Sequence, residues 1–523
     1  MRIRKLLRVR FVVYSFTEQE KIMAELTPMM QKYMETKEQY KDCILFYRLG
    51  DFYEMFFDDA IVASKELEIA LTGKSCGLEE RAPMCGIPYH AVETYLARLV
   101  SRGYKVAICE QVEDPKLAKG LVKREVIRVV TPGTNLDVQS LEASKNNYLM
   151  CIAYTSDGIG ISAADVTTGD YYVTEVEDLR KLKDELMKYE PSEIICNEAF
   201  LVSGYDVEDL KSRLHMSVSS LESHMFDDDG CRRILMRHFK VNTLIGLGVE
   251  EFPTGILAAG ALLQYLYDTQ KTDLEHFTHI SPYLTSKYML LDSSTRRNLE
   301  LTETLREKQK RGSLLWVLDK TKTAMGGRLL RNYIEQPLID KEEMEKRLDA
   351  IQELNQDSIS RDEIREYLNP VYDLERLLSK VTYKTANPRD LIAFRNSLQM
   401  LPPIKTVLAG FQKEELAAIR EEIDGLEDIY QLIDEAIVEE PPISIREGGM
   451  IKDQFDETID HLRAAKHDGK QWLVQLEEED RERTGIKNLK IKKNNVFGYF
   501  FEVTNSYKDL VPEDYIRKQT LAN

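Results

Sequence analysis

The spacing of apolar and polar residues divides the chain into an N-terminal part that alternates strands with helices and a C-terminal part dominated by helices. Residues 43–47 form a short apolar run, which predicts a buried strand. Residues 91–100 have the periodicity of an amphipathic helix, and Gly103 beyond them suits a helix end. A second apolar run at 104–109 predicts another strand. The pattern indicates a compact α/β domain that ends at the polar stretch 136–147, a predicted linker.

A second unit follows this linker and begins with three strands in a meander. The predicted strands are 148–155, 159–165 and 171–176, separated by the hairpin signal Asp157-Gly158 and the turn signal Thr168-Gly169. A leucine-rich amphipathic helix and a strand at 193–196 come next.

From about residue 256 the chain is overwhelmingly helical. Apolar residues recur at near-heptad spacing between residues 451 and 483, so a single long helix is the simplest interpretation. This apolar stripe consists of Phe455, Ile459, Leu462, Trp472, Leu473 and Leu476. After Thr484 the pattern becomes β, because residues 495–504 combine large apolar side chains with the turn-forming Gly498.

Length and composition place the chain among soluble multidomain proteins. A chain of 523 residues is too long for a single core and predicts three or four domains. The apolar run at 256–267 is interrupted by Gln264 and stops at Asp268, so it falls short of a membrane span. Seven cysteines without a CxxC pair fit free thiols in a reducing cytosol better than a disulfide framework.

The charge distribution is more informative than the total. A net charge of −18 argues by itself against a nucleic-acid partner, because Lys and Arg contacts to phosphates dominate such affinity. Two segments are basic despite the acidic total. Residues 487–501 contain four lysines and no acidic residue, and residues 116–128 contain five basic residues and a single acidic one, Glu125. The basic residues are Lys487, Lys490, Lys492 and Lys493, and Lys116, Lys119, Lys123, Arg124 and Arg128. They are candidate phosphate contacts, although a solvated basic face would have the same composition.

The stretch Leu49-Gly50-Asp51-Phe52-Tyr53-Glu54 directly follows the first predicted strand. Gly50-Asp51 is turn chemistry, so Phe52 and Glu54 are expected where the strand leaves into a loop. Extended geometry would direct both side chains to one side and Tyr53 to the other. On the local pattern alone, such alternation is typical of core packing in a half-buried strand.

Longer motifs change this interpretation, because together they resemble bacterial MutS, a DNA mismatch repair family. The resemblance covers residues 24–523 in the family's order. The motifs are Leu26-Thr27-Pro28-Met29-Met30-Gln31-Lys32-Tyr33, Phe46-Tyr47-Arg48-Leu49-Gly50-Asp51-Phe52-Tyr53-Glu54, Ala82-Pro83-Met84-Cys85-Gly86-Ile87-Pro88-Tyr89-His90, Ala107-Ile108-Cys109-Glu110-Gln111-Val112, Val130-Thr131-Pro132-Gly133-Thr134, Thr295-Arg296-Arg297-Asn298-Leu299-Glu300 and Glu482-Arg483-Thr484-Gly485-Ile486.

The resemblance implies an α/β plus mainly α multidomain fold. Its expected parts are an α/β mismatch-binding domain (23–137), a ribonuclease H-like connector (145–255), a long-helix core and lever domain (256–482) and the first part of a small, incomplete β clamp (483–523). Residues 1–22 form a basic extension of doubtful status, interpreted as sequence upstream of the family's usual start near Met23, with organelle import as a minor alternative. The family's ATPase domain would lie beyond residue 523, so the chain is expected to be a piece of a longer protein or a natural protein without that motor.

The resemblance also implies roles for individual residues. The aromatic ring of Phe52 would wedge beside a mispaired base from the minor groove, and Glu54 would accept a hydrogen bond from that base. Leu49, Pro83 and Met84 would line the same base step. The DNA backbone would be contacted in the clamp by Lys487, Lys490, Lys492, Lys493, Asn494 and Asn495.

The same resemblance sets the expected partners and cofactors. The partners are double-stranded DNA with mismatches or small loops, a second copy in a homodimer, and a MutL-type repair protein, with no membrane. The chain itself is expected to be no enzyme and to hold no cofactor, because ATP and Mg belong to the full-length family's ATPase domain. The expected location is the cytoplasm, in association with the nucleoid.

Other chemistries have weak support in the sequence. Gly73-Lys74-Ser75 imitates the end of a phosphate-binding loop, but Glu68 stands where that loop's first glycine belongs. His276 and His279 could share a helical face, yet two ligands do not make a zinc site. A nuclease on the connector would need several converging carboxylates, and Asp165 has no obvious partner in sequence.

The sequence therefore predicts a DNA-binding sensor of mismatches. One alternative is a truncated paralogue that acts as an architectural or dominant-negative DNA binder. Another is a helical protein-interaction scaffold whose α/β domains have lost DNA binding. Phe52 and Glu54 argue against the scaffold, because a relative without mismatch recognition would lack that pair.

Overall fold

The structure, a computed structural model, describes residues 26–113, 122–137, 141–212, 214, 216–494, 498–512 and 514–516. The chain forms two compact units. The first comprises the residues up to Ala386 together with Ala393–Glu427, and the second comprises Asn387–Ile392 and the residues from Asp428 onward.

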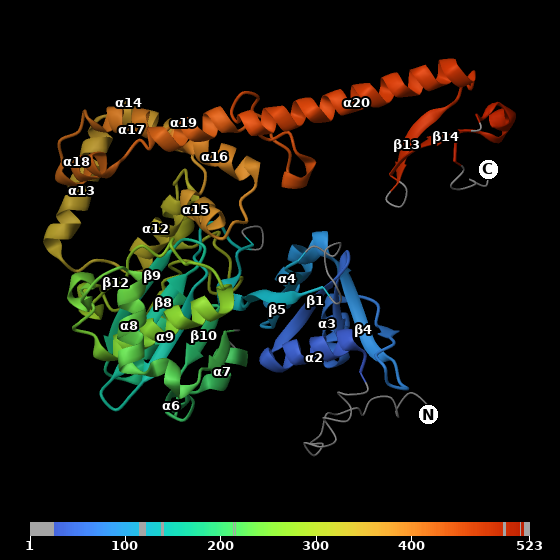
Figure 1. Ribbon diagram of the computed structural model, residues 1–523. Coiled ribbons are helices and arrows are strands. Elements are labelled where there is room, and N and C mark those ends of the chain that lie inside the picture. The colour runs from blue at the N-terminus through green and yellow to red at the C-terminus, as the bar shows by residue number, and fades with distance from the viewer. Residues whose placement is uncertain are drawn as a thin grey trace. The chain divides into compact units, whose positions relative to one another are not determined.

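The first domain of the first unit is built on a mixed sheet in the order β3-β4-β2-β1-β5-β6. Its central strand β1 pairs parallel with β5 and antiparallel with β2. Figure 1 shows β1, β4 and β5 of this sheet with the helices α2, α3 and α4. The elements are β1 (Cys43–Leu49), β2 (Phe52–Phe56), β3 (Thr72–Lys74), β4 (Ala82–Pro88), β5 (Lys105–Gln111) and β6 (Arg124–Val130), with α2 (Pro28–Gln39), α3 (Phe57–Leu67) and α4 (Val92–Val100). The α/β domain and its strands at 43–47 and 104–109 are as predicted.

Helices cover both faces of this sheet. On one face, Tyr33 of α2 packs against Tyr47 and Phe56 with ring centroids 5.4 and 4.9 Å apart. On the other face, α3 and α4 bury Phe46 and Met55 among their apolar residues. Successive side chains of β1 and β2 thus enter two separate cores, as the pleat of a strand requires.

The second domain has a sheet in the order β11-β10-β7-β8-β9-β12. Strands β7, β8 and β9 form the predicted antiparallel meander, and β10 pairs parallel with β7. The strands are β7 (Leu149–Tyr154), β8 (Ile159–Asp165), β9 (Asp170–Val176), β10 (Glu193–Cys196), β11 (Ser217–Ser220) and β12 (Ser281–Pro282). The helices are α5 (Leu179–Tyr189), α6 (Glu198–Leu201), α7 (Val207–Ser212), α8 (Asp228–His238) and α9 (Pro253–Gln270).

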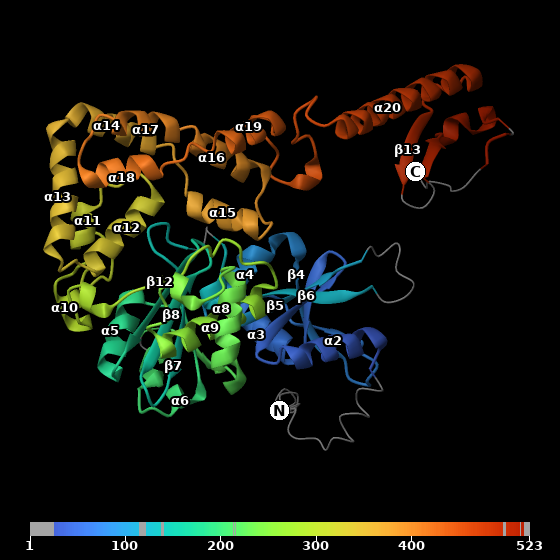
Figure 2. The ribbon, with the colours of Figure 1, turned by 60° about the vertical axis from the view of Figure 1, so that its left-hand side comes forward.

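Helix α9 packs on this sheet together with α8, while α5, α6 and α7 cover the opposite face (Figure 2). Gly160 of β8 permits the close approach, because a Cβ there would lie 1.9 Å from the carbonyl oxygen of Thr254. The domain boundary predicted between residues 255 and 256 therefore falls inside a helix whose buried residues belong to the core of this sheet. The sequence suggested otherwise because α9 is apolar on nearly all sides and resembles the helical region that follows it.

The rest of the first unit is helical. Small apolar cores join α13, α14, α17 and α18 and, separately, α11 and α12. The helices are α10 (Ser293–Asn298), α11 (Leu314–Leu318), α12 (Ala324–Glu335), α13 (Lys341–Gln356), α14 (Ser358–Leu368), α15 (Leu374–Thr382), α17 (Leu401–Leu408) and α18 (Glu414–Glu422), while α16 (Pro388–Leu398) spans the boundary with the second unit.

Two buried arginines of this helical part hold the described end of the predicted linker. Arg328 donates to both carboxylate oxygens of Asp373 at 2.7 Å and to the carbonyl oxygen of Ala143 at 2.9 Å. Arg376 donates to the carbonyl oxygen of Lys145 at 2.8 Å. The backbone carbonyl groups of the linker accept hydrogen bonds from these guanidinium groups, which would be costly to bury without acceptors.

The second unit contains the predicted long helix and a hairpin. Helix α20 (Glu457–Thr484) begins at the side-chain cap Asp456 and ends at Gly485, whose φ is +68°. It follows α19 (Glu427–Ala436) and precedes β13 (Lys490–Asn494) and β14 (Gly498–Glu502). Of the predicted apolar stripe, Phe455 lies before the helix, and Leu462 and Trp472 are exposed on it.

All seven cysteines are buried, free thiols. Burial raises the pKa of Cys85 and of Cys109 to about 12, so these thiols are unreactive at neutral pH. Over the residues that the structure describes, no helix is both long and apolar enough to cross a membrane.

Candidate nucleic-acid interface

Phe52 and Glu54 lie on a β-hairpin and not at the exit into a loop, which corrects the sequence prediction. Gly50 and Asp51 form a two-residue connection between β1 and β2, with Leu49 paired to Phe52. Gly50 has a φ of +59°, and a positive φ at the first central residue is typical of a type II′ hairpin turn. The turn returns the chain into a second strand, so Phe52 is the first residue of β2.

The register of the sheet decides which of the predicted residues share a face. Phe52 and Glu54 alternate with the buried Tyr53, and their partners across the sheet place Leu49 and Met84 on the same face. Pro83 occupies the intervening position of β4 and so lies on the opposite face. The structure therefore brings four of the five predicted base-step residues to one face and separates Pro83 from them.

Phe52 stands at the uncovered end of this face. Tyr33 of α2 covers the end nearer Phe56, which is buried. The side chain of Phe52 is 48% exposed, whereas Tyr53 beside it is 4% exposed. A large aromatic side chain exposed at a hairpin turn gains little from folding, and it is available to contact another molecule.

A polar network beneath the turn holds the hairpin in place. The guanidinium carbon of Arg48 lies 3.7 Å from the ring centroid of Tyr89, and Arg48 pairs with Glu110 at 3.1 Å. Tyr53 donates a short hydrogen bond to the same Glu110 oxygen, and burial together with this bond raises the pKa of Tyr53. The Tyr89 amide donates to the Asp51 carbonyl oxygen at 3.0 Å. The position of Phe52 is therefore fixed by groups on three other strands or their ends.

The carboxylate of Glu54 has a partner that sequence reasoning missed. Its Oε2 atom lies 2.5 Å from Nζ of Lys74 on β3. In the sequence, Gly73-Lys74-Ser75 imitates the end of a phosphate-binding loop. In the structure Lys74 is a strand residue, and residues 75–81 after it are not helical, so it lacks the helix that such a loop requires.

The basic segment at 116–128 offers few available cations. Lys116 and Lys119 lie outside the described residues. Lys123 is exposed but pairs with Glu125 at 2.6 Å. Arg124 donates to the carbonyl oxygen of Arg48 at 2.8 Å and thereby joins the hairpin network. Burial lowers the pKa of Arg128, whose Nε atom is buried.

The lysines of the second unit are exposed on the β13–β14 hairpin or just before it. Lys487, Lys490, Lys492 and Lys493 all point to solvent. Lys492 pairs with Glu502 at 2.7 Å, and Nζ of Lys493 lies 5.4 Å from the ring centroid of Tyr499. Asn494 ends β13 opposite Gly498, and Asn495 lies outside the described residues.

Two charged groups of α20 anchor this hairpin. The Ile491 amide donates to Glu477 at 2.7 Å, and Arg481 donates to the carbonyl oxygen of Leu489 at 2.8 Å. Leu489 and Ile486 are fully buried beside the helix end. The lysines are therefore presented from a strand fixed to the helix.

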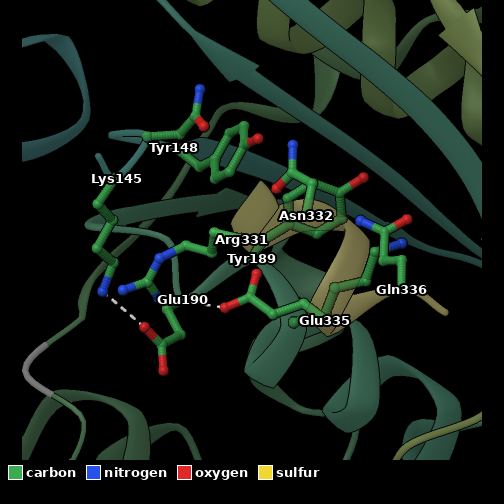
Figure 3. A pocket seen from close by; sticks show the side chains of 10 residues that line it. Lys145, Tyr148, Tyr189, Glu190, Arg331, Asn332, Glu335 and Gln336 are labelled. Carbon is green, nitrogen blue, oxygen red and sulfur yellow. Dashed lines mark hydrogen bonds and ion pairs between the residues drawn. The ribbon is translucent and has the colours of Figure 1, made fainter. Parts of the chain in front are cut away.

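A small polar pocket lies in the first unit between the second domain and α12 (Figure 3). Lys145 pairs there with Glu190 at 2.6 Å, and Arg331 pairs with Glu335 at 3.2 Å. Each labelled cation thus faces a carboxylate. Because the charges balance, the pocket suits a packed interface between two domains better than it suits an anion-binding site.

The residues considered for metal or nuclease chemistry have other contacts. Asp165 accepts from the Asn147 amide at 2.9 Å and from the Thr167 hydroxyl at 2.7 Å. His276 lies in a loop, where its ring packs 5.1 Å from that of Tyr383, and burial lowers its pKa to about 4. His276 and His279 therefore do not share a helical face. Across the described part of the chain, no group of three or more metal-ligating side chains is found.

Comparison with known proteins gives three matches to family models along the chain. MutS domain I matches residues 27–139, MutS domain II matches 147–280 and MutS domain III matches 294–511. A protein of Lachnoclostridium phytofermentans named DNA mismatch repair protein MutS is 65% identical over 501 residues, which cover 96% of this chain and 54% of that protein. Proteins of the same name from Ruminiclostridium cellulolyticum and Acetivibrio thermocellus are 54% and 53% identical, and the matches cover 57% and 58% of their length. The chain spans about half the length of the curated relatives it matches.

Proposed function

Because the chain belongs to the MutS family, we propose that it recognises mispaired or looped-out bases in duplex DNA and so initiates mismatch repair. One observation carries this proposal. Phe52, half-exposed at the start of β2, shares a face of the sheet with Glu54 and is held by a partly buried polar network. A rigid, exposed aromatic ring beside a hydrogen-bond acceptor suits a base that has left its stack.

The affinity gained by inserting Phe52 would depend on how easily the duplex deforms at that step. A mispaired base has lost part of its pairing and stacking, so a kink at that step costs less than at a matched step. Apolar wedges in the minor groove kink duplexes by roughly 20–90°. Stacking of the base on Phe52 would return about 1–3 kcal/mol, which is the part of the affinity that depends on the mismatch.

Glu54 would add selectivity by a different route. The carboxylate must lose water when duplex DNA covers it, so it disfavours intact DNA unless a displaced base supplies a hydrogen-bond donor. Leu49 and Met84 share its face and would contact the same base step. Pro83, on the opposite face, would act by shaping β4 and not by contact.

The lysines at 487, 490, 492 and 493 and the neighbouring Asn494 and Asn495 would bind phosphates. Such contacts hold the register on DNA and carry no sequence information. Lys487 and Lys490 suit this role best, because within the described residues their exposed ammonium groups have no carboxylate partner.

At the level of the whole protein we propose what the family resemblance implies. The parts would be a mismatch-binding domain, a ribonuclease H-like connector, a core with a lever helix, and a clamp. ATP and Mg would act in an ATPase domain in the half of the relatives that this chain does not span. Homodimer formation, a MutL-type partner and a cytoplasmic, nucleoid-associated location belong to the same proposal.

The test is the ratio of affinities for two duplexes of equal length, one with a single G·T pair or one-base loop and one fully matched. We expect the 523-residue chain to prefer the defective duplex and Phe52→Ala to bring the ratio to about one. Ile61→Ala is the matched control, because Ile61 is a similarly exposed apolar residue of the same domain, on α3. Retention of the preference by Phe52→Ala would overturn the proposal.

A further inference from the structure

The two oxygens of the Glu54 carboxylate are not equivalent. Oε2 lies 2.5 Å from Nζ of Lys74, whereas Oε1 has no hydrogen-bond partner among the described residues. The Glu54 side chain is 17% exposed and that of Lys74 is 34% exposed, so the pair is partly removed from solvent. Ion pairs in such positions restrict side-chain geometry more than those between fully exposed groups.

The fold brings this pair together across an intervening strand. Lys74 is on β3 and Glu54 on β2, and β4 lies between them. Small residues of β4 face the pair, because Ala82 is opposite Lys74 and Gly86 is opposite Glu54. A Cβ on Gly86 would lie 3.6 Å from Cγ of Glu54, so the stem of Glu54 runs directly over this glycine.

Lys74 is also held from a second side. Its Nζ lies 5.5 Å from the ring centroid of Phe56, a buried residue of β2 on the same face as Glu54. A cation between an aromatic ring and a carboxylate has less freedom to reach an external phosphate than a solvated lysine. The arrangement therefore suits a cation that acts on Glu54.

We propose that Lys74 is a positioning residue for specificity: it binds Oε2 of Glu54 and so leaves Oε1 directed toward the base that stacks on Phe52. This inference rests on the proposed function and adds a residue to it. A carboxylate held by one oxygen loses less rotational freedom when the other oxygen accepts a hydrogen bond. Lys74 thereby increases the difference in affinity between defective and matched DNA.

The test uses this ratio of affinities, because phosphate contacts are the same in both duplexes and cancel in it. The variants are Lys74→Met, Glu54→Ala, the double variant, and Lys74→Arg, which keeps the cation. Lys32→Met is the control, since it removes an exposed ion pair with Glu35 elsewhere in the domain. Circular dichroism verifies that each variant is folded.

We expect Lys74→Met to lower the ratio about fivefold, and Lys74→Arg and Lys32→Met to preserve it. In the Glu54→Ala background, Lys74→Met should lower the ratio no further, because the carboxylate it positions is absent. The inference is wrong if Lys74→Met weakens binding to both duplexes equally, as a phosphate contact would, or lowers the ratio equally in both backgrounds. If the unmodified chain binds both duplexes equally, the proposed function itself fails. If Phe52→Ala abolishes the preference for the defective duplex while Lys74→Met preserves it, only this inference is overturned.

Discussion

Glu335, the last residue of α12, should make the free energy of unfolding depend on pH. It lines the polar pocket between the second domain and α12, where Arg331 is its ion-pair partner (Figure 3). Burial raises the pKa of Glu335 to about 7, with Glu190 adding to this and Arg331 opposing it. The ordinary value for glutamate is 4.5. The folded protein therefore binds this proton more tightly than the unfolded chain does.

The sign and size of the effect follow from proton linkage. A carboxyl group whose pKa is raised in the folded state stabilises the protein at pH values below the pKa that the group has in the unfolded chain. This stabilisation is lost as pH rises through about 7. Between pH 5 and pH 8 the loss amounts to about 2.5 kcal/mol, since each unit of pKa corresponds to about 1.4 kcal/mol. Glu335→Gln removes the titrating proton and should remove this part of the pH dependence.

The assay is urea unfolding of the 523-residue chain at pH 5 and pH 8, with and without Glu335→Gln. We expect the change in unfolding free energy between the two pH values to differ by about 2.5 kcal/mol between variant and parent. Glu345→Gln serves as the control, because Glu345 is an exposed glutamate on the next helix. Equal pH dependence in Glu335→Gln and the parent would refute the reasoning.

Two further predictions concern a buried junction and the lysines of the β13–β14 hairpin. Lys105→Met should destabilise the protein by about 3 kcal/mol in urea unfolding, because it leaves the fully buried Glu193 carboxylate without its cation. The hydrogen bond that Tyr265 donates to Glu193 at 2.8 Å remains in this variant. A double variant with Glu193→Gln should recover part of the lost stability, and no recovery would contradict the account. Lys490→Ala should weaken binding to matched and mismatched duplexes alike by a few-fold and lower the salt dependence of binding by about one ion. Lys492→Ala should have a smaller effect, because Lys492 is paired with Glu502. A change in the ratio of affinities between the two duplexes would contradict a phosphate-binding role.

Local pattern predicted much of the fold where hydrogen bonds and burial are local in sequence. The meander at 148–176 was predictable because Asp157-Gly158 and Thr168-Gly169 fix tight turns between alternating strands. The long helix was predicted from the apolar spacing between residues 451 and 483, and in the structure it begins somewhat later, at Glu457, after the side-chain cap Asp456.

The prediction failed at one misread local turn and where the outcome depended on distant partners. Gly50-Asp51 was interpreted as a loop exit, although glycine at the first position of a two-residue connection favours a hairpin. The ion pair of Lys74 with Glu54 depends on the placement of β3 beyond β4, and no local pattern specifies that order. The opposite orientation of Pro83 has the same origin, since it follows from the register of β4 against β2.

The central claim, that Phe52 lies against the defective base, can be measured with a duplex that carries 5-iodouracil at the mispaired position. Irradiation links that base to an aromatic side chain in contact with it, and mass spectrometry identifies the peptide. We predict that the linked peptide spans residues 49–65 and that the residue is Phe52, with little product from a duplex in which the same base is paired. Linkage to a different segment, or equal yields from the matched and mismatched duplexes, would contradict the account.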